Sequence, residues 1–177
     1  MLIALTNASR AHEIKNIDPT LIRDHGDTVT FPIAQLTKSK RQNKPNIAIT
    51  LTVYAEDSLL DALTGYRAYM KRTAIWRQTD EQKHQLFLSL VNPHKPIATS
   101  TVSRWLREIM TEAGVNTDIF KAHSVRGAST SKASHEGLSV GQIIETANWS
   151  NATTFQKFYC RTLQQSNTTY QDTVLKL

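Results

Sequence analysis

Two stretches in the first third of the chain are rich in β-branched residues and lie next to turn-forming ones. Residues 28–33 read Thr-Val-Thr-Phe-Pro-Ile, and residues 46–53 alternate as Asn-Ile-Ala-Ile-Thr-Leu-Thr-Val. This alternation predicts half-buried β-strands. Residues 20–23 fit a third strand, because the tight-turn sequence His25-Gly26-Asp27 follows them. The pattern therefore predicts a small antiparallel sheet of three strands near the N-terminus.

Apolar residues at helical spacing predict helices on both sides of this sheet. Residues 2–16 read as one short helix. After the sheet, Asp57 or Ser58 is placed to cap a helix that runs to about Trp76. Its apolar stripe, expected to lie in the core, is formed by Leu59, Leu63, Tyr66 and Met70.

A second long helix is predicted in the middle of the chain. It begins at Thr99 or Ser100 and ends at Gly114, a residue type that favours helix ends. Ahead of it, the polar residues 78–85 predict a loop, and residues 85–90 predict a short strand.

The last third of the chain predicts three further helices. One begins near His123 and ends at Gly137, and another covers residues 138–146. A third is expected over residues 152–161. The polar stretch after it predicts a joint, followed by the apolar residues Tyr170, Val174 and Leu175. Such a short amphipathic segment needs a surface against which it can bury its apolar side.

Composition narrows the class of protein. With 177 residues, 40% of them apolar, the chain can form one domain with its own core. A formal net charge of +6 favours a polyanionic partner without identifying one. The single cysteine, Cys160, excludes an internal disulfide and favours a reducing compartment. No signal peptide or membrane-spanning run is recognisable.

Four polar residues near the C-terminus could together bind and attack a phosphate. His123 and Arg126 are three residues apart and would share one helix face. Arginine offers a bidentate fork to phosphate, and histidine a proton that is exchanged near neutral pH. Downstream, Trp149 offers an indole N–H and Tyr159 a hydroxyl that can attack phosphorus. The histidines show no metal-ligand spacing, so we predict no metal site.

The order of these motifs resembles the catalytic domain of the tyrosine recombinases, the relatives of the phage integrases. The motifs that carry the resemblance are His123-Ser-Val-Arg126-Gly127, then Trp149-Ser150, then the run Thr153-Thr-Phe-Gln-Lys-Phe-Tyr159-Cys-Arg161. Arg10 followed by Glu13 is similar to the first catalytic arginine of that family. Trp149 and Tyr159 are ten residues apart, one more than in many relatives, and the motif Trp-Ser-x-x-x-Thr-Phe-x-x-Phe-Tyr is similar to recombinases of eukaryotic mobile elements of the DIRS and Crypton kinds.

The resemblance implies a mostly helical α+β fold and a set of catalytic roles. Tyr159 would attack the scissile phosphorus and form a 3′-phosphotyrosyl link. Arg10 and Arg126 would bind the non-bridging oxygens, while His123 and Trp149 would assist at the phosphate. Neither a metal nor another cofactor is implied.

A basic hairpin tip is expected to supply the catalytic lysine. Lys38 matches the family position, and Lys40 remains an alternative because it would share the same strand face. Lys40, Arg41 and Lys44 in this hairpin are candidate DNA contacts. So are Arg104 and Arg107, which stand off the apolar stripe of their helix.

The resemblance also implies an organisation and a partner. Residues 1–161 would form the catalytic domain, without the DNA-clamping domain that precedes it in relatives. Residues 162–177 would form a tail that is exchanged between protomers of a tetramer on double-stranded DNA. An origin in a eukaryotic mobile element would place the protein in the nucleus. Two alternatives stay open: a catalytically silent DNA-binding protein, and a type IB topoisomerase-like enzyme that relaxes DNA.

Overall fold

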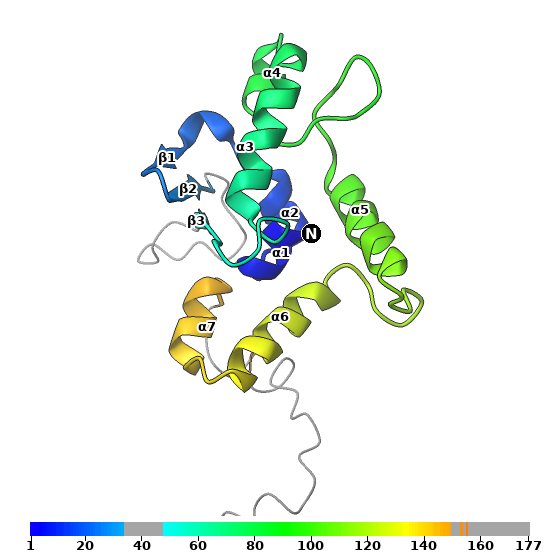
Figure 1. Ribbon diagram of the computed structural model, residues 1–177. Helices are drawn as coiled ribbons and strands as arrows, with labels where there is room; N and C mark the ends of the chain where they lie inside the picture. The colour runs from blue at the N-terminus through cyan, green and yellow to red at the C-terminus, as the bar shows by residue number, and fades with distance from the viewer. Residues whose placement is uncertain (34–47, 150–152, 154, 156–177) are drawn as a thin grey trace, which may run out of the picture.

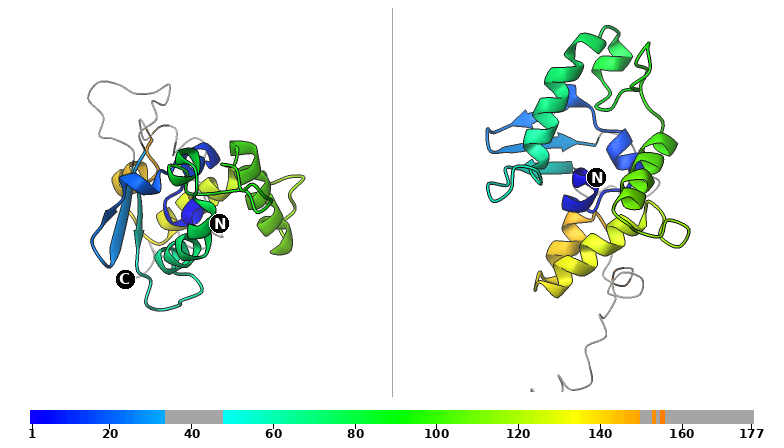
Figure 2. Two further views of the ribbon diagram at one scale, coloured as in Figure 1. Left: turned by 90° about the horizontal axis from the view of Figure 1, so that it is seen from above. Right: turned by 45° about the vertical axis from the view of Figure 1, so that its right-hand side comes forward.

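The protein forms a helical body with a small sheet on one side, as Figures 1 and 2 show for this computed structural model. The structure describes residues 1–33, 48–149, 153 and 155. Helices α1 (Leu2–Thr6) and α2 (Ala11–Lys15) lie at the centre. The sheet and α3 (Ala62–Thr73) lie on one side of them, and α6 (Ser124–His135) and α7 (Val140–Thr146) lie on the other. The fold class is therefore the predicted one, mostly helical α+β.

The predicted antiparallel sheet is confirmed. Strands β1 (Arg23–Asp24), β2 (Thr28–Pro32) and β3 (Ala48–Thr52) pair in the order β1-β2-β3. In the β2–β3 register, Val29 lies opposite Leu51 and Phe31 opposite Ile49. All four side chains are buried, because alternate strand residues point to the same face. They pack with residues of α2, α3 and α5 (Thr99–Glu112) in the main core.

The predicted helix over residues 2–16 is wrong in one respect, because it is broken between Thr6 and Ala11. Ala8 has a φ of 45°, a left-handed conformation that ends α1. Arg10 is extended and starts a new helix, α2. Arg10, which the sequence predicts to be the first catalytic arginine, thus lies at the start of a helix.

The predicted strand over residues 20–23 is also mostly wrong. Pro19–Leu21 forms a 3-10 turn, η1, and of residues 20–23 only Arg23 belongs to a strand, β1. The carboxylate of Asp18 accepts hydrogen bonds from the backbone N–H and the hydroxyl of Thr20, at 2.8 and 2.7 Å. Proline at the first position of the turn adds to this local preference.

Helix α3 begins at a later residue than predicted. Its N-cap is Asp61, whose carboxylate accepts from the backbone N–H groups of Leu63 (2.9 Å) and Thr64 (3.2 Å). A hydrogen bond from the Thr64 hydroxyl lowers the pKa of the Asp61 carboxyl. Leu59 therefore lies outside the helix and is 85% exposed, not in the core. The helix ends in a short 3-10 turn, η2 (Ala74–Trp76).

The predicted loop over residues 78–85 contains a short helix, α4 (Asp80–Lys83). A capping box between Thr79 and Gln82 starts it. Because four residues cannot form a stable helix alone, tertiary contacts must hold it. The buried Gln82 amide donates to the carbonyl oxygen of Pro93 at 2.8 Å. The strand predicted over residues 85–90 is reduced to one bridge, between Leu88 and Pro96.

Helices α5, α6 and α7 lie where the sequence predicted helices. The stripe of Val102, Leu106 and Met110 on α5 is buried. Gly114 and Gly137 follow α5 and α6 with φ of 78° and 90°, conformations that favour glycine. None of the helices in the described part of the chain is long and apolar enough to span a bilayer. The helix predicted over residues 152–161 lies almost wholly outside the described residues.

Candidate active site

The start of α2 places a buried carboxylate beside an exposed arginine. Glu13 accepts a hydrogen bond from the backbone N–H of Arg10 at 2.6 Å. Its other oxygen, Oε1, pairs with Arg10 Nη1 at 2.8 Å. The Glu13 side chain is 2% exposed, whereas that of Arg10 is 41% exposed. Glu13 therefore orients a guanidinium group that still faces solvent.

Arg126 of α6 reaches the same carboxylate from the opposite side. Its Nη1 lies 3.6 Å from Glu13 Oε2 and donates to the carbonyl oxygen of Ala8 at 2.9 Å. Its Nη2 donates to the carbonyl oxygen of Ala147, at the end of α7. The side chain is 4% exposed. Two arginines far apart in the sequence are thus gathered at one buried carboxylate.

Trp149 covers the Arg126 guanidinium. The Arg126 Cζ lies 4.9 Å from the centre of the indole ring, a cation–π distance. Trp149 also packs against Phe155, with ring centroids 5.5 Å apart. Both aromatic residues belong to a small buried cluster with Ala8, Ile143 and Ala147. The structure therefore brings together Arg10, Arg126 and Trp149, three of the six predicted catalytic residues.

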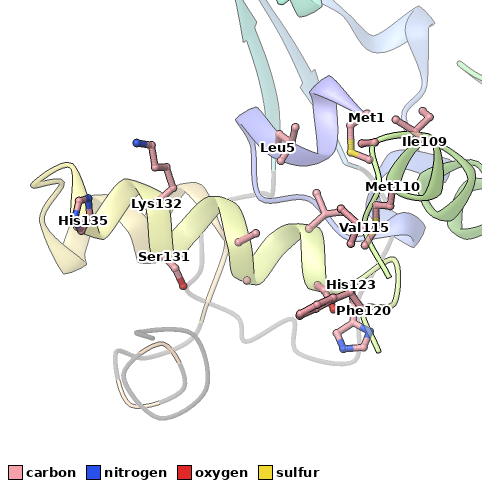
Figure 3. Close-up of a pocket in the computed structure, with 15 residues that line it drawn as sticks. Met1, Leu5, Ile109, Met110, Val115, Phe120, His123, Ser131, Lys132 and His135 are labelled. Carbon is pink, nitrogen blue, oxygen red and sulfur yellow. The ribbon is translucent and has the colours of Figure 1, made fainter. Parts of the chain in front are cut away.

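His123 is placed differently from these three. It is the N-cap residue of α6 and is exposed. It lines a groove of about 890 Å³, on the face of α6 that carries Ser124, Ala128 and Ser131 (Figure 3). The backbone carbonyl of His123 accepts a hydrogen bond from the backbone N–H of Arg126 at 3.2 Å, as at the start of a helix. Their side chains lie in different surroundings, because His123 lines the groove and Arg126 is buried beside Glu13.

This groove is mostly apolar and lies between α5, α6 and the start of α1. Met110 of α5, Val115 and Phe120 of the following loop, and Met1 and Leu5 contribute apolar side chains (Figure 3). Residues three, four and seven apart on a helix share a face, so this face of α6 differs from the one that buries Arg126 and Thr130. One face of α6 therefore contributes Arg126 to the arginine cluster, and another face lines the groove.

The remaining predicted site residues divide into two groups. Arg104 and Arg107 are exposed on α5, and Arg104 pairs with Glu108 at 2.6 Å. Lys38, Lys40, Arg41, Lys44 and Tyr159 lie outside the described residues, so the predictions for them stay predictions. Within residues 1–33 and 48–149, no group of three histidine, cysteine, aspartate or glutamate side chains is placed to hold a metal ion.

Two features of the site were not predicted from the sequence: the contact of Glu13 with Arg126, and the part played by two backbone carbonyls. Glu13 is expected from the sequence as the motif residue after Arg10 and, like Glu56, as a possible partner of its charge, and the structure confirms the pair with Glu13. Its contact with Arg126 depends on the packing of α1 against both α2 and α6. The carbonyls of Ala8 and Ala147 have no sequence signal, because any residue carries a backbone carbonyl.

We expect Glu13→Ala to lower the free energy of unfolding by about 2 kcal/mol, because the buried Arg126 would lose the carboxylate that lies 3.6 Å from its Nη1. Urea unfolding measures the change. Glu108→Ala is the matched control, since the Arg104–Glu108 pair is exposed at both ends. An exposed pair contributes about 0–1 kcal/mol. Equal small losses in both variants would contradict a stabilising role for Glu13.

Comparison with solved structures shows the same fold. A crystal structure of XerA recombinase matches with a TM-score of 0.61 and 16% identity, over 97% of this chain and 52% of that one. A structure of XerH recombinase bound to difH substrate, a pre-cleavage complex, matches with a TM-score of 0.64 and 13% identity. That match covers 88% of this chain and 40% of the XerH chain. The chain thus spans about half or less of the length of these recombinases.

The comparisons also cover sequence. No significant match was found among curated proteins. Nothing in these comparisons tests the likeness to recombinases of DIRS and Crypton elements, which stays a prediction. The model of the phage integrase family matches residues 1–165, which is most of the chain. This match over most of the sequence, with which the fold agrees, shows that the chain belongs to the phage integrase family.

Proposed function

We propose that this chain is the catalytic domain of a site-specific DNA recombinase that cuts and rejoins strands through Tyr159. The observation that supports it best is the gathering of Arg10 and Arg126 at the buried Glu13. A buried carboxylate holds two cations close together in the absence of DNA. A scissile phosphate would then meet preorganised donors, which stabilise the negative charge of the transition state.

Within this proposal the two arginines act in different ways. Arg10 is 41% exposed and meets the phosphate directly. Arg126 is 4% exposed and lies under the Trp149 ring. A cation–π contact contributes about 0.5–2 kcal/mol, and a charge-assisted bond to phosphate offsets its loss. Trp149 therefore moves off the guanidinium when DNA binds, and its indole N–H turns to the phosphate.

The chemistry is a transesterification that stores the energy of the broken bond. The Tyr159 oxygen forms a bond to phosphorus, and the bond from phosphorus to the 5′-oxygen breaks. The phenolic proton passes to His123 or to water, and Lys38 or Lys40 gives a proton to the departing 5′-oxygen. Attack by that 5′-hydroxyl on the phosphotyrosine reverses the step and rejoins a strand. Exposed cations on α5, Arg104 and Arg107, contact the DNA backbone.

The test uses DNA whose sequence need not be known beforehand. The protein is incubated with a pool of nicked duplexes that carry a randomised segment, and complexes that survive denaturing detergent are recovered and sequenced. We expect a covalent adduct whose peptide maps to Tyr159. A shift in native gels with no adduct would support the silent DNA-binding alternative. Plasmid relaxation with no recombinant product would support the topoisomerase alternative.

We further propose that the chain assembles as a tetramer on DNA through the tail, residues 162–177. The tail lies outside the described residues, but its apolar residues Tyr170, Val174 and Leu175 need a surface to bury them. The apolar groove beside α6 offers such a surface on a neighbouring protomer (Figure 3). A neighbour's tail inserted there would contact α6, the helix that carries Arg126. Binding of the neighbour would thereby be coupled to the position of that helix.

Deletion of residues 163–177 is therefore expected to weaken assembly more than binding. On DNA with one site, affinity should stay within about threefold of that of the full chain, because backbone contacts dominate it. On DNA with two sites, the slower complex with several protomers should be lost. Native gels of both chains on both DNAs measure this. Equal loss on both DNAs, or no loss on either, would argue against exchange of the tail.

A further inference from the structure

The segment between α1 and α2 contains a buried amide side chain that joins two distant parts of the fold. Asn7 is 8% exposed. Its Oδ1 accepts a hydrogen bond from the backbone N–H of Thr50, in the middle of β3, at 2.9 Å. Its Nδ2 donates to the Thr6 hydroxyl at 3.0 Å. Since β3 is the last strand in the order β1-β2-β3, Asn7 satisfies a donor at its outer edge.

Ala8, the residue after Asn7, contacts the arginine cluster. Ala8 is 4% exposed and adopts a φ of 45°, which an L-residue with a side chain rarely does. In that conformation its carbonyl oxygen accepts from Arg126 Nη1 at 2.9 Å. An unfavourable backbone conformation persists only where its surroundings hold it. The Thr50–Asn7 bond lies immediately before Ala8, and the bond from Ser9 N–H to Ala4 O (3.2 Å) immediately after it.

We infer that Asn7 is a positioning residue for the strand-transfer reaction, an inference that rests on the proposed function. It acts through the Ala8 carbonyl, which sets the orientation of the Arg126 guanidinium. The sheet thereby fixes the direction in which one of the two arginines presents its donors. Arg10 follows Ala8 by two residues, so the same link sets where α2 begins.

A purely structural role makes a different prediction. If Asn7 only capped the edge of β3, its loss would lower stability and slow every reaction of the protein to the same extent. If it positions Arg126, its loss should matter most where the reaction relies on that arginine. A substrate with a neutral methylphosphonate at the scissile position relies on it less, since one anionic oxygen is replaced by a methyl group. The two substrates therefore separate the roles.

The test compares Asn7→Leu, which removes the acceptor at similar size, with Asn7→Asp, which keeps it. Thr6→Val is the matched control, because it removes the neighbouring hydroxyl and leaves the Thr50–Asn7 bond. Cleavage is measured in single turnover at saturating DNA, at a temperature where circular dichroism shows every variant folded. We expect Asn7→Leu to slow cleavage of the phosphodiester roughly tenfold, the effect of one hydrogen bond, and cleavage of the methylphosphonate less than about threefold. Asn7→Asp and Thr6→Val should stay within about threefold on both. Equal slowing of both substrates by Asn7→Leu would overturn the inference.

A second measurement does not depend on cleavage. Both Nη groups of Arg126 donate to backbone carbonyls, so rotation of its guanidinium should be slow in nitrogen-15 NMR spectra. The signal is assigned from Arg126→Lys. Asn7→Leu, or Asn7→Ala where leucine prevents folding, should speed this rotation, and Thr6→Val should not. Unchanged rotation in the Asn7 variants would overturn the inference. An altered rotation in a protein that forms no adduct with any DNA would instead refute the proposed function.

Discussion

Tyr159→Phe is expected to abolish the covalent adduct with DNA while DNA affinity stays within about twofold of that of the unaltered chain. The substitution removes one oxygen atom, which is the proposed nucleophile. Affinity should hardly change, because contacts of cationic side chains with the phosphate backbone dominate it. Denaturing gels measure the adduct, and native gels measure the affinity on the same DNA.

The other tyrosines in the described part of the chain are poor nucleophiles. The Tyr54 hydroxyl donates to Glu56 at 2.8 Å, and this hydrogen bond raises the pKa of Tyr54. Burial raises the pKa of Tyr66 and of Tyr69. The backbone N–H of Leu88 donates to the Tyr69 oxygen at 3.0 Å, which lowers the pKa but by less than burial raises it. Because the deprotonated oxygen is the better nucleophile, a raised pKa makes attack by these residues slower.

Tyr54→Phe is accordingly the matched control for Tyr159→Phe. Its hydroxyl is exposed and serves only Glu56 in the described contacts, so adduct formation should not change. An adduct that persists in Tyr159→Phe and maps by peptide sequencing to Tyr54, Tyr66, Tyr69 or Tyr170 would refute the assignment of the nucleophile.

The sequence predicted the elements whose pattern is local. Strands β2 and β3 follow from β-branched alternation, and α5 follows from its apolar stripe and Gly114. The 3-10 turn η1 was predicted as a strand, although Asp18-Pro19 is a local signal for it. The sequence of this segment thus fits both a strand and a turn. The hydrogen bonds that the Asp18 carboxylate accepts from Thr20 favour the turn.

Elements that depend on distant partners were not predictable. Helix α4 is too short to form alone, and the contact of Gln82 with the Pro93 carbonyl holds it. The break between α1 and α2 depends on Ala8, whose left-handed conformation has no local cause such as glycine. Its carbonyl accepts from Arg126, far away in the sequence. A periodicity argument cannot include such a contact.

The same distinction applies to the candidate site. Motif order was enough to select Arg10, Arg126 and Trp149, which the structure brings together. It could not show that Arg126 is buried under Trp149, nor that Glu13 lies between the two arginines. Burial follows from the packing of α1 against α6 and of α6 against α7, which no spacing within one motif contains. The residue types and their order thus predicted which side chains form the cluster. Tertiary packing determined which of them is buried.

Arg126→Ala is expected to impair both folding and cleavage, because this side chain has partners in three parts of the fold. Its removal leaves the buried Glu13 paired with Arg10 alone among the described residues, and the Ala8 and Ala147 carbonyls lose their donor. Loss of one member of a buried ion pair costs about 3–5 kcal/mol of unfolding free energy. Loss of one donor to the transition state slows cleavage by roughly 10²–10³-fold.

Arg10→Ala separates these two effects. Its side chain is 41% exposed, so unfolding free energy should fall by only about 1 kcal/mol, whereas cleavage should slow as much as in Arg126→Ala. Urea unfolding and single-turnover cleavage are measured on both variants, at a temperature where both are folded. Arg126→Ala that is folded and cleaves within tenfold of the unaltered chain would show that Arg126 is structural only. An equal fall in the unfolding free energy of both variants would show that the burial of Arg126 under Trp149 does not add to stability.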